Sequence, residues 1–305
     1  MEKSGFVHVP GPLMKKLLFF YGASWKDLHS LEAGYVHAMV PRDPEPVMEY
    51  RQVAFHRILI EPKDRVTIKD KENKRNHCCD VGSSESFNFV PAMTQAVTQI
   101  PQKEIASTSE EGSKLHFKRS GTRYWPLPPA SYAAESSVPG AMVALNSGLL
   151  PAKHQAQINI NHEHKTTLND QILVRTQRKP LTDESYSPTP EGIHQDNSEI
   201  SSVTLVCLHG VKSGGESRLW TLDTPAGNYS EDDFNNGVLK NNLLLNHALR
   251  DPWETLYFND RMVKHEARAF DGDRPCTRDV IVNFLRKPLN DGHDKKVVGD
   301  SLVSI

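Results

Sequence analysis

The sequence predicts an α+β protein with a mainly β core, in which helices come first and an antiparallel sandwich or barrel follows. Three observations predict this class. Helical periodicity is clearest before Pro41, whereas short strand-like runs separated by Gly, Pro, Asn and Asp recur after residue 155. The 305 residues are 37% hydrophobic and 24% charged, the ordinary composition of a water-soluble globular chain.

Two helices and one strand are predicted in the N-terminal part. Apolar side chains recur on one face between residues 12 and 22, where a proline precedes the pattern and a glycine ends it. Ser24, followed three positions later by Asp27, resembles a capping box and predicts a second helix over residues 24–41. A β-rich run over residues 53–60 follows.

The middle of the chain predicts little regular structure. Residues 63–120 are charged and polar, with one modest apolar patch at 87–97, and predict a partly mobile insertion. Residues 126–151 contain several prolines and predict a loop-rich passage. We therefore divide the chain into N-terminal helices with a first strand, a polar insertion, a β core that carries the chemistry and a C-terminal tail: 1–62, 63–120, 121–290 and 291–305.

Short strands are predicted throughout the second half. Their separation by turn-forming residues favours an antiparallel arrangement over a parallel one. Residues 230–249 interrupt this series and predict a single helix or a loop with a helix. The predicted strands are 157–161, 172–174, 203–208, 217–220, 255–258 and 280–284.

Charge and cysteine content narrow the possible partners and compartment. Lys and Arg number 36 against 38 Asp and Glu, a net charge of −2 that lacks the basic footprint of a nucleic-acid-binding surface. The longest apolar run near the N-terminus is too short for a membrane span or an export signal. The 4 cysteines are sparse, so we expect reduced thiols in a cytoplasmic protein. From the balanced charge and the short apolar run, we expect that it binds neither nucleic acid nor membrane.

Three side chains form a pattern that is typical of a metal site. His194 and Asp196 are two positions apart at the predicted start of a strand, where both side chains point to one face. His265 follows a later β-run, with enough intervening chain to return beside the first pair. Two imidazoles and one carboxylate leave open metal positions, which suits a non-haem Fe(II) oxygenase. A competing pair, His162 and His164, lies in a polar context, which favours a surface position.

Arg278 precedes the hydrophobic run 280–284 and is predicted to enter the barrel. A guanidinium there needs an anion bound in a bidentate manner to compensate for its lost hydration. A dicarboxylate co-substrate would supply that anion.

These segments resemble a known family. Residues 188–196 (Pro-Thr-Pro-Glu-Gly-Ile-His-Gln-Asp), 213–217 (Ser-Gly-Gly-Glu-Ser) and 251–284 are similar to the Fe(II)/2-oxoglutarate dioxygenases that hydroxylate free amino acids, of the isoleucine hydroxylase type. The likeness covers roughly residues 170–285. This chain departs from the family at Asn197, where the family often has Gly, and in the insertion at 63–120.

The resemblance implies a fold, a cofactor set and ligand residues. The fold is a double-stranded β-helix, a jelly-roll or cupin-like barrel with the N-terminal helices packed on it. Iron is then held by His194, Asp196 and His265, and the distal carboxylate of 2-oxoglutarate by Arg278, with O2 as the other co-substrate. Apart from the resemblance, Arg175 and Arg51 are candidates to hold a substrate carboxylate, with a surface ion pair as the alternative for each. Glu191 is a candidate to orient a ligand in the substrate site, with a solvated loop position as its alternative.

The implied activity is oxidation of an unactivated C–H bond of a free amino acid or an amino-acid-derived small molecule, with decarboxylation of 2-oxoglutarate to succinate. One alternative is oxidative ring closure of an N-prenylated glutamate, the reaction of the algal kainoid synthases of secondary metabolism. Another alternative is a non-catalytic module that binds a metal or a small acid. The iron motif is compatible with hydroxylation and with ring closure.

Overall fold

The computed structural model describes thirteen segments of the chain. These are residues 3–35, 50–62, 87–92, 96–99, 105–108, 114–117, 121–124, 126–149, 167–178, 188–189, 192–196, 198–235 and 239–286.

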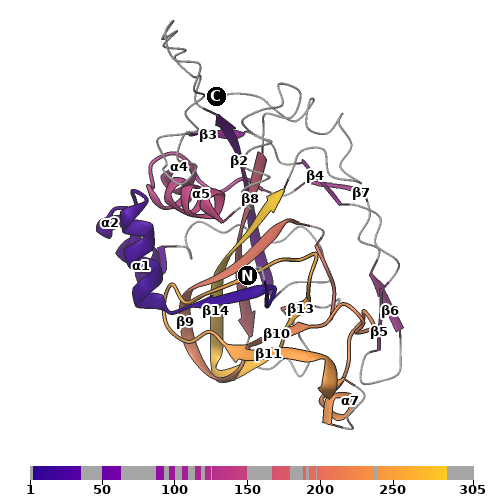
Figure 1. Cartoon of the computed structure of the whole chain (residues 1–305). Coiled ribbons are helices and arrows are strands. Elements are labelled where there is room, and N and C mark those ends of the chain that lie inside the picture. The colour runs from indigo at the N-terminus through magenta and orange to yellow at the C-terminus, as the bar shows by residue number, and fades with distance from the viewer. Residues whose placement is uncertain are drawn as a thin grey trace, which may run out of the picture.

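Two antiparallel sheets form the core (Figure 1). The large sheet has seven strands in the order β1-β12-β9-β14-β8-β2-β3, and the small sheet has three in the order β11-β10-β13. This is the mainly β, double-stranded β-helix architecture that the sequence predicts. The large-sheet strands are β1 (Phe6–Val9), β2 (Arg51–Pro62), β3 (Phe87–Ala92), β8 (Thr167–Arg178), β9 (Ile200–Gly214), β12 (Thr255–Phe258) and β14 (Phe270–Arg286). The small-sheet strands are β10 (Glu216–Trp220), β11 (Leu243–Ala248) and β13 (Lys264–Ala267).

The long strands β8 and β14 give the large sheet two different faces. They pair without interruption from Cys276 opposite Arg178 to Arg286 opposite Leu168. Because successive side chains of a strand alternate between faces, every second residue points towards the small sheet and the others point away from it. The face directed away from the small sheet packs against helices.

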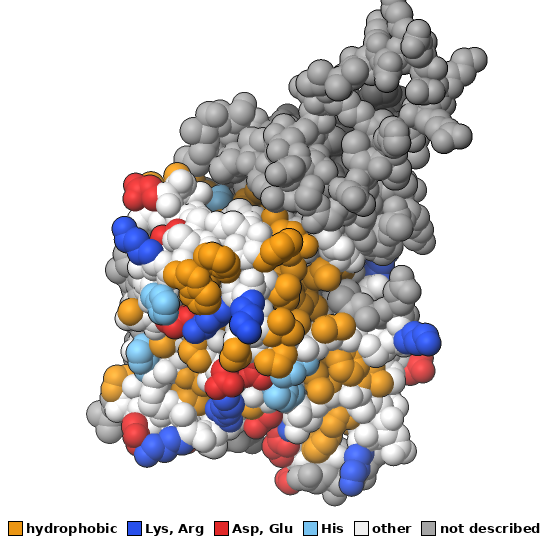
Figure 2. All heavy atoms as spheres, turned by 60° about the vertical axis from the view of Figure 1, so that its left-hand side comes forward, with side chains coloured by type: hydrophobic (Ala, Val, Ile, Leu, Met, Phe, Trp, Pro, Cys, Tyr) orange, Lys and Arg blue, Asp and Glu red, His pale blue; other side chains and the backbone are white. Residues whose placement is uncertain are grey.

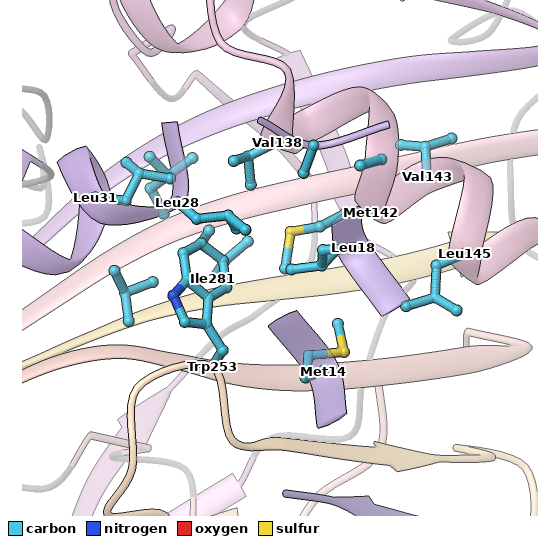
Figure 3. Close-up of a cluster of buried hydrophobic side chains, with 14 of the residues drawn as sticks. Met14, Leu18, Leu28, Leu31, Val138, Met142, Val143, Leu145, Trp253 and Ile281 are labelled. Atoms are coloured by element: carbon cyan, nitrogen blue, oxygen red, sulfur yellow. The ribbon is translucent and has the colours of Figure 1, made fainter. Parts of the chain in front are cut away.

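The helices and this face share one apolar cluster (Figure 3). The helices are α1 (Gly11–Phe20), α2 (Trp25–Ser30), α4 (Ala130–Ala133) and α5 (Val138–Gly148). Leu18 of α1 and Met142 of α5 belong to this cluster together with Leu173 of β8 and Ile281 of β14. Each of these four side chains is at most 1% exposed, so this packing holds the helices on the large sheet.

The outer side of the first two helices is partly apolar. Phe20 is 79% exposed, and Phe19 stacks on Trp25 with ring centroids 5.3 Å apart. Figure 2 shows hydrophobic side chains gathered on the face that comes forward from the left of Figure 1, where these helices lie.

The first predicted helix is confirmed, and the second is shorter than predicted. Ser24 caps α2 as its pattern indicates, because its Oγ accepts a hydrogen bond of 3.1 Å from the amide of Asp27. The helix ends at Ser30 and continues as a π-type turn, η1 (Leu31–Tyr35). Gly34 has a φ of +95° in this turn, which breaks the α-helical geometry. The rest of the predicted helix lies outside the described residues.

The prediction for residues 230–249 is wrong in its second half. A short helix, α7 (Glu231–Asn235), and a 3-10 turn, η3 (Lys240–Asn242), are followed by strand β11. Leu243 and Leu245 alternate with more exposed residues, and the strand pairs along β10. Pairing with an existing sheet edge therefore decided the structure of a leucine-rich run that fits either pattern.

The prediction of a loop-rich passage over 126–151 is also wrong, because this passage contains α4 and α5. Helix α5 is buried over most of its length, so its apolar residues do not show the one-sided period of a surface helix. Pro139 lies in its first turn, where a proline is tolerated. Strand β1, which was not predicted, pairs with β12 at the edge of the large sheet.

The predicted insertion at 63–120 contains short strands. Strand β3 extends the large sheet beside β2, whereas β4 (Ala96–Gln99) pairs with β7 (Gly121–Tyr124) and β5 (Ile105–Thr108) with β6 (Lys114–Phe117). The predicted strand 157–161 lies outside the described residues. No helix in the described part of the chain has the length and apolar character needed to cross a membrane.

Candidate active site

His194, Asp196 and His265 lie together between the two sheets. Their potential ligand atoms are all within 4.8 Å of one another. The Oδ2 of Asp196 is 3.1 Å from Nε2 of His265 and 3.7 Å from Nε2 of His194. The two histidine rings have centroids 4.2 Å apart. The structure thus brings together the three side chains that the sequence pattern selects.

The backbone of the two histidines holds them opposite each other. The amide of His194 donates to the carbonyl of His265 at 3.0 Å, and the reverse bond is 2.9 Å long. The prediction that His194 begins a regular strand is wrong, because this pairing is an isolated bridge and Asp196 lies in irregular backbone. His194 is therefore positioned by its bridge to β13 and not by a continuous strand of its own.

A glycine, Gly192, allows the segment that carries His194 to pass close to the backbone of Gly227. Gly192 has a φ of +68°, and a Cβ at this position would lie 2.2 Å from the carbonyl oxygen of Gly227. Ile193 forms a bridge with Gly227 through hydrogen bonds of 2.7 and 3.0 Å. A residue with a side chain at position 192 would therefore strain or displace the segment that carries His194.

A backbone carbonyl orients the ring of His194, and a carboxylate lies beside the ring of His265. The Nδ1 of His194 donates to the carbonyl of Gly192 at 2.8 Å, so Nε2 is the nitrogen that is directed towards Asp196 as a potential ligand. The Nδ1 of His265 is 3.2 Å from Oδ1 of Asp260, a carboxylate that is fully buried. The ring of Phe258 also lies against His265, with centroids 4.7 Å apart. Sequence reasoning missed the role of Asp260, because no spacing rule connects it to the ring of His265.

The electrostatics of the cluster favour a positive charge among its carboxylates. Burial raises the pKa of Asp196, but His194 and His265 outweigh it and hold this pKa well below its ordinary value. Burial lowers the pKa of His265, but Asp196 and Asp260 outweigh it and raise this pKa to about 10. A divalent cation would replace the proton on His265 and interact with the same carboxylates.

The three side chains and Arg278 line one cavity between the sheets. Arg278 is only 4% exposed, although it carries a full charge. Most of the cavity wall is apolar. Its apolar side chains include Phe55, Ile172, Val174, Val203, Leu219, Leu256, Phe258, Val280, Val282 and Phe284.

A row of three polar side chains crosses the large sheet at this cavity. Thr176 of β8 lies opposite Arg51 of β2 on one side and opposite Arg278 of β14 on the other. All three line the cavity. Neighbouring strands are about 4.8 Å apart, so the Cα atoms of the two arginines are about 10 Å apart. The row therefore places two guanidinium groups on one wall.

Other expected contacts lie elsewhere. Arg175 does not line the cavity. Its Nε and Nη2 donate to the buried carboxylate of Asp279 at 3.1 and 3.3 Å, on the opposite face of the large sheet. The structure therefore does not bring Arg175 to the site. Glu191 and Asn197 lie outside the described residues, as do His162 and His164.

The cavity also contains a buried ion pair that sequence reasoning missed. Asp170, which lines the cavity, accepts hydrogen bonds of 2.7 and 2.9 Å from Nε and Nη2 of Arg57. Both side chains are at most 4% exposed. The signal available in the sequence was the position of Arg57 inside the hydrophobic run 53–60. This pair faces the cavity with its charge already compensated.

Comparisons with known proteins define the class. Residues 146–284 match the family model described as 2OG-Fe dioxygenase. No match was found among curated proteins. The family match, which covers a little under half of the chain, identifies a 2OG-Fe dioxygenase domain in residues 146–284. Such a domain is an oxidoreductase whose cofactors are Fe(II), 2-oxoglutarate and O2.

Solved structures agree on the fold. A bsmA homolog from Methylobium petroleophilum PM1 has a TM-score of 0.59 and 15% identity, and the match covers 96% of this chain and 92% of that one. The Fe(II)/(alpha)ketoglutarate-dependent dioxygenase TqaL has a TM-score of 0.59 and 15% identity, covering 94% and 84%. IDO from Bacillus thuringiensis has a TM-score of 0.54 and 13% identity, covering 94% and 92%. At these identities the likeness concerns the fold alone.

Proposed function

We propose that this chain binds Fe(II) through His194, Asp196 and His265, anchors 2-oxoglutarate on Arg278, and oxidises an unactivated C–H bond of an amino-acid-like small molecule. One observation carries the proposal: the three potential ligands and the buried arginine line one cavity. When bound, the iron and 2-oxoglutarate supply the O2-dependent oxidation, which converts the co-substrate to succinate and carbon dioxide.

The donor set fits Fe(II). Two imidazole nitrogens and one carboxylate oxygen on one side of a metal leave the remaining positions open for co-substrate and O2. Gly192 and Asp260 hold the rings of His194 and His265 by their Nδ1 atoms, which supports a fixed ligand geometry.

Arg278 suits the distal carboxylate of 2-oxoglutarate. Its guanidinium has the planar donor geometry that a carboxylate binds in a bidentate manner. The neighbouring cavity residues Val280 and Val282 are apolar, which strengthens a charge-assisted hydrogen bond. The hydroxyl of Thr176, opposite Arg278 on β8, is a further donor towards the same anion.

Arg51 supports an acidic small-molecule substrate. It lines the same cavity and lies two strands away from Arg278, about 10 Å between Cα atoms. This spacing provides a second carboxylate site beside the co-substrate, and an amino acid or its derivative has such a carboxylate. Phe55 and Ile172 offer apolar contacts for the hydrocarbon part of the substrate. A concave cavity of this kind between two sheets favours a small molecule over a polymer.

The test is mass spectrometry of aerobic reactions that contain Fe(II), 2-oxoglutarate, ascorbate and a panel of free amino acids and N-alkylated or N-prenylated glutamates. We expect succinate together with a product that is heavier by one oxygen. A product that is lighter by two hydrogens indicates desaturation or ring closure on the same iron site. The Asp196→Ala variant is the control and should give neither product. Absence of succinate with every substrate, despite bound iron, would contradict the proposal and favour a non-catalytic binding module.

Arg51 can be tested separately. Replacing it by Gln keeps a hydrogen-bond donor and removes the charge, so the KM for the accepted substrate should rise while the KM for 2-oxoglutarate stays the same. An equal rise in both values would assign Arg51 to the co-substrate or to the shape of the cavity.

A further inference from the structure

A second cluster of potential metal ligands lies apart from the cavity. His8 of β1, His247 of β11 and Glu254, which directly precedes β12, place their ligand atoms within 4.8 Å of one another. The Nε2 atoms of His8 and His247 are 2.7 and 2.6 Å from the same oxygen, Oε1 of Glu254. None of the three residues lines the cavity that contains His194.

The loop before β12 presents this carboxylate in one orientation. Its other oxygen, Oε2, accepts hydrogen bonds from the amides of Arg250 at 2.6 Å and Asp251 at 3.1 Å. The side chain of Glu254 is only 8% exposed, so these amides hold the group while Oε1 faces the two imidazoles. Backbone contacts of this kind preorganise a carboxylate ligand.

Charge and access both suit a cation. Burial raises the pKa of Glu254, but hydrogen bonds from His247, from the two amides and from His8 outweigh it and lower this pKa to about 2. The group is therefore ionised at neutral pH. The side chains of His8 and His247 are 33% and 34% exposed, so an ion can reach Nε2 from solvent.

The ligand set resembles that of a zinc site with one open position. Two imidazole nitrogens and one carboxylate oxygen suit Zn²⁺, which takes such ligands at about 2.0–2.2 Å in a tetrahedral arrangement. That arrangement separates neighbouring ligand atoms by about 3.3 Å. The present separations of 2.7 and 2.6 Å would have to widen by roughly 0.6 Å when the shared protons leave. The partly exposed histidines have the freedom to make this adjustment.

We propose that His8, His247 and Glu254 form a second metal site, which binds Zn²⁺ and is independent of the oxygenase centre. The site joins β1, an edge strand of the large sheet, and the residue before β12 of the same sheet to β11 of the small sheet. A bound ion clamps the two sheets together at a surface position. It also secures the first strand of the chain, which is paired only to β12 among the described strands.

The experiment is titration calorimetry with Zn²⁺ alone, combined with native mass spectrometry. The wild-type chain should bind two ions, because the candidate iron ligands also accept zinc. A His194→Ala/Asp196→Ala variant removes that background and should bind one. Adding His247→Gln to this background should weaken binding of the remaining ion at least about 100-fold. His8→Gln is the second test, with the same expectation.

Glutamine is the matched substitution because its side-chain amide still donates to Glu254 while being a poor ligand for zinc. A pure hydrogen-bonded clamp would therefore survive both changes, whereas a metal site would not. In the background variant, saturating Zn²⁺ should raise the melting temperature by about 5 °C, and the glutamine variants should lack this rise. Absence of zinc binding in the background variant, or equal binding after His247→Gln, would overturn the proposal. Neither readout depends on the oxygenase activity.

Discussion

The two faces of the large sheet are built by the same strands but differ in what they contain. Towards the helices, Leu173 and Ile281 are fully buried in a closed apolar cluster. Towards the small sheet, their chain neighbours Val174 and Val280 line the cavity that holds Arg278. Alternation along a strand thus allows one pair of strands to support the fold and to form a wall of the site. Substitutions on one face should alter stability, and those on the other should alter function.

The largest effect is expected inside the cavity. Replacing His194, Asp196 or His265 by Ala removes one of three proposed iron ligands and should abolish succinate formation. The removal of buried charge from the cluster should leave the fold intact, so the melting curve should keep its cooperativity. Coupled measurement of succinate and bound iron checks this. A variant with normal succinate formation would remove its residue from the proposed site.

A neighbouring pair of residues sharpens the comparison. Leu173→Ala leaves a void on the helix face and should lower the free energy of unfolding by about 2–5 kcal/mol. Val174→Ala enlarges a space that is already open and should cost less than about 1.5 kcal/mol. Chemical denaturation measures both. Turnover per folded molecule should stay normal in the first variant and change in the second; the reverse pattern would contradict the assignment of the faces.

The two arginines of β8 and β14 give a matched test of co-substrate binding. Arg278→Ala should raise the KM for 2-oxoglutarate by about 10- to 100-fold, because a charge-assisted bidentate pair contributes about 1.5–3 kcal/mol. Arg175→Ala breaks the ion pair with Asp279 on the opposite face and should lower stability without changing this KM. Steady-state kinetics of both variants distinguish the roles. An unchanged KM in the Arg278 variant would place the anchor elsewhere.

The smallest effect concerns His56, a buried polar residue on the helix face that packs against Tyr132 with ring centroids 6.3 Å apart. Burial lowers its pKa from 6.5 to about 4. In the unfolded chain His56 therefore binds a proton below pH 6.5, whereas in the folded chain it does so only below about pH 4. The free energy of unfolding therefore falls as the pH drops through this window. At pH 5.5 the loss should be about 1.4 kcal/mol.

Denaturation curves between pH 8 and pH 5 would measure this loss. His56→Leu removes the titrating group and fills its buried position with an apolar side chain, so the stability of this variant should depend less on pH over this range. An equally steep dependence in both proteins would assign the effect to another group.

Local signals in the sequence predicted a good part of the structure. The cap at Ser24 and the strand run over 53–60 depend on neighbouring residues alone, and both are present in the fold. Helix α5 and strand β11 were missed because their structure depends on contacts with distant parts of the chain. A helix buried on nearly all sides has no one-sided period, and a leucine-rich run becomes a strand only when a sheet edge is available.

The sequence by itself determined the composition of the candidate site. His194 and Asp196 are two positions apart, so their proximity needs no long-range contact, and the motifs around them indicate the class of enzyme. The sequence also selected the distant residues His265 and Arg278, but only the tertiary structure decided how they meet this pair and that Arg175 does not. The bridge between His194 and His265 completes the cluster, and the register of β8 with β14 turns Arg278 towards it and Arg175 away. Register and bridging arise from long-range pairing, which the spacing of residues along the chain does not encode.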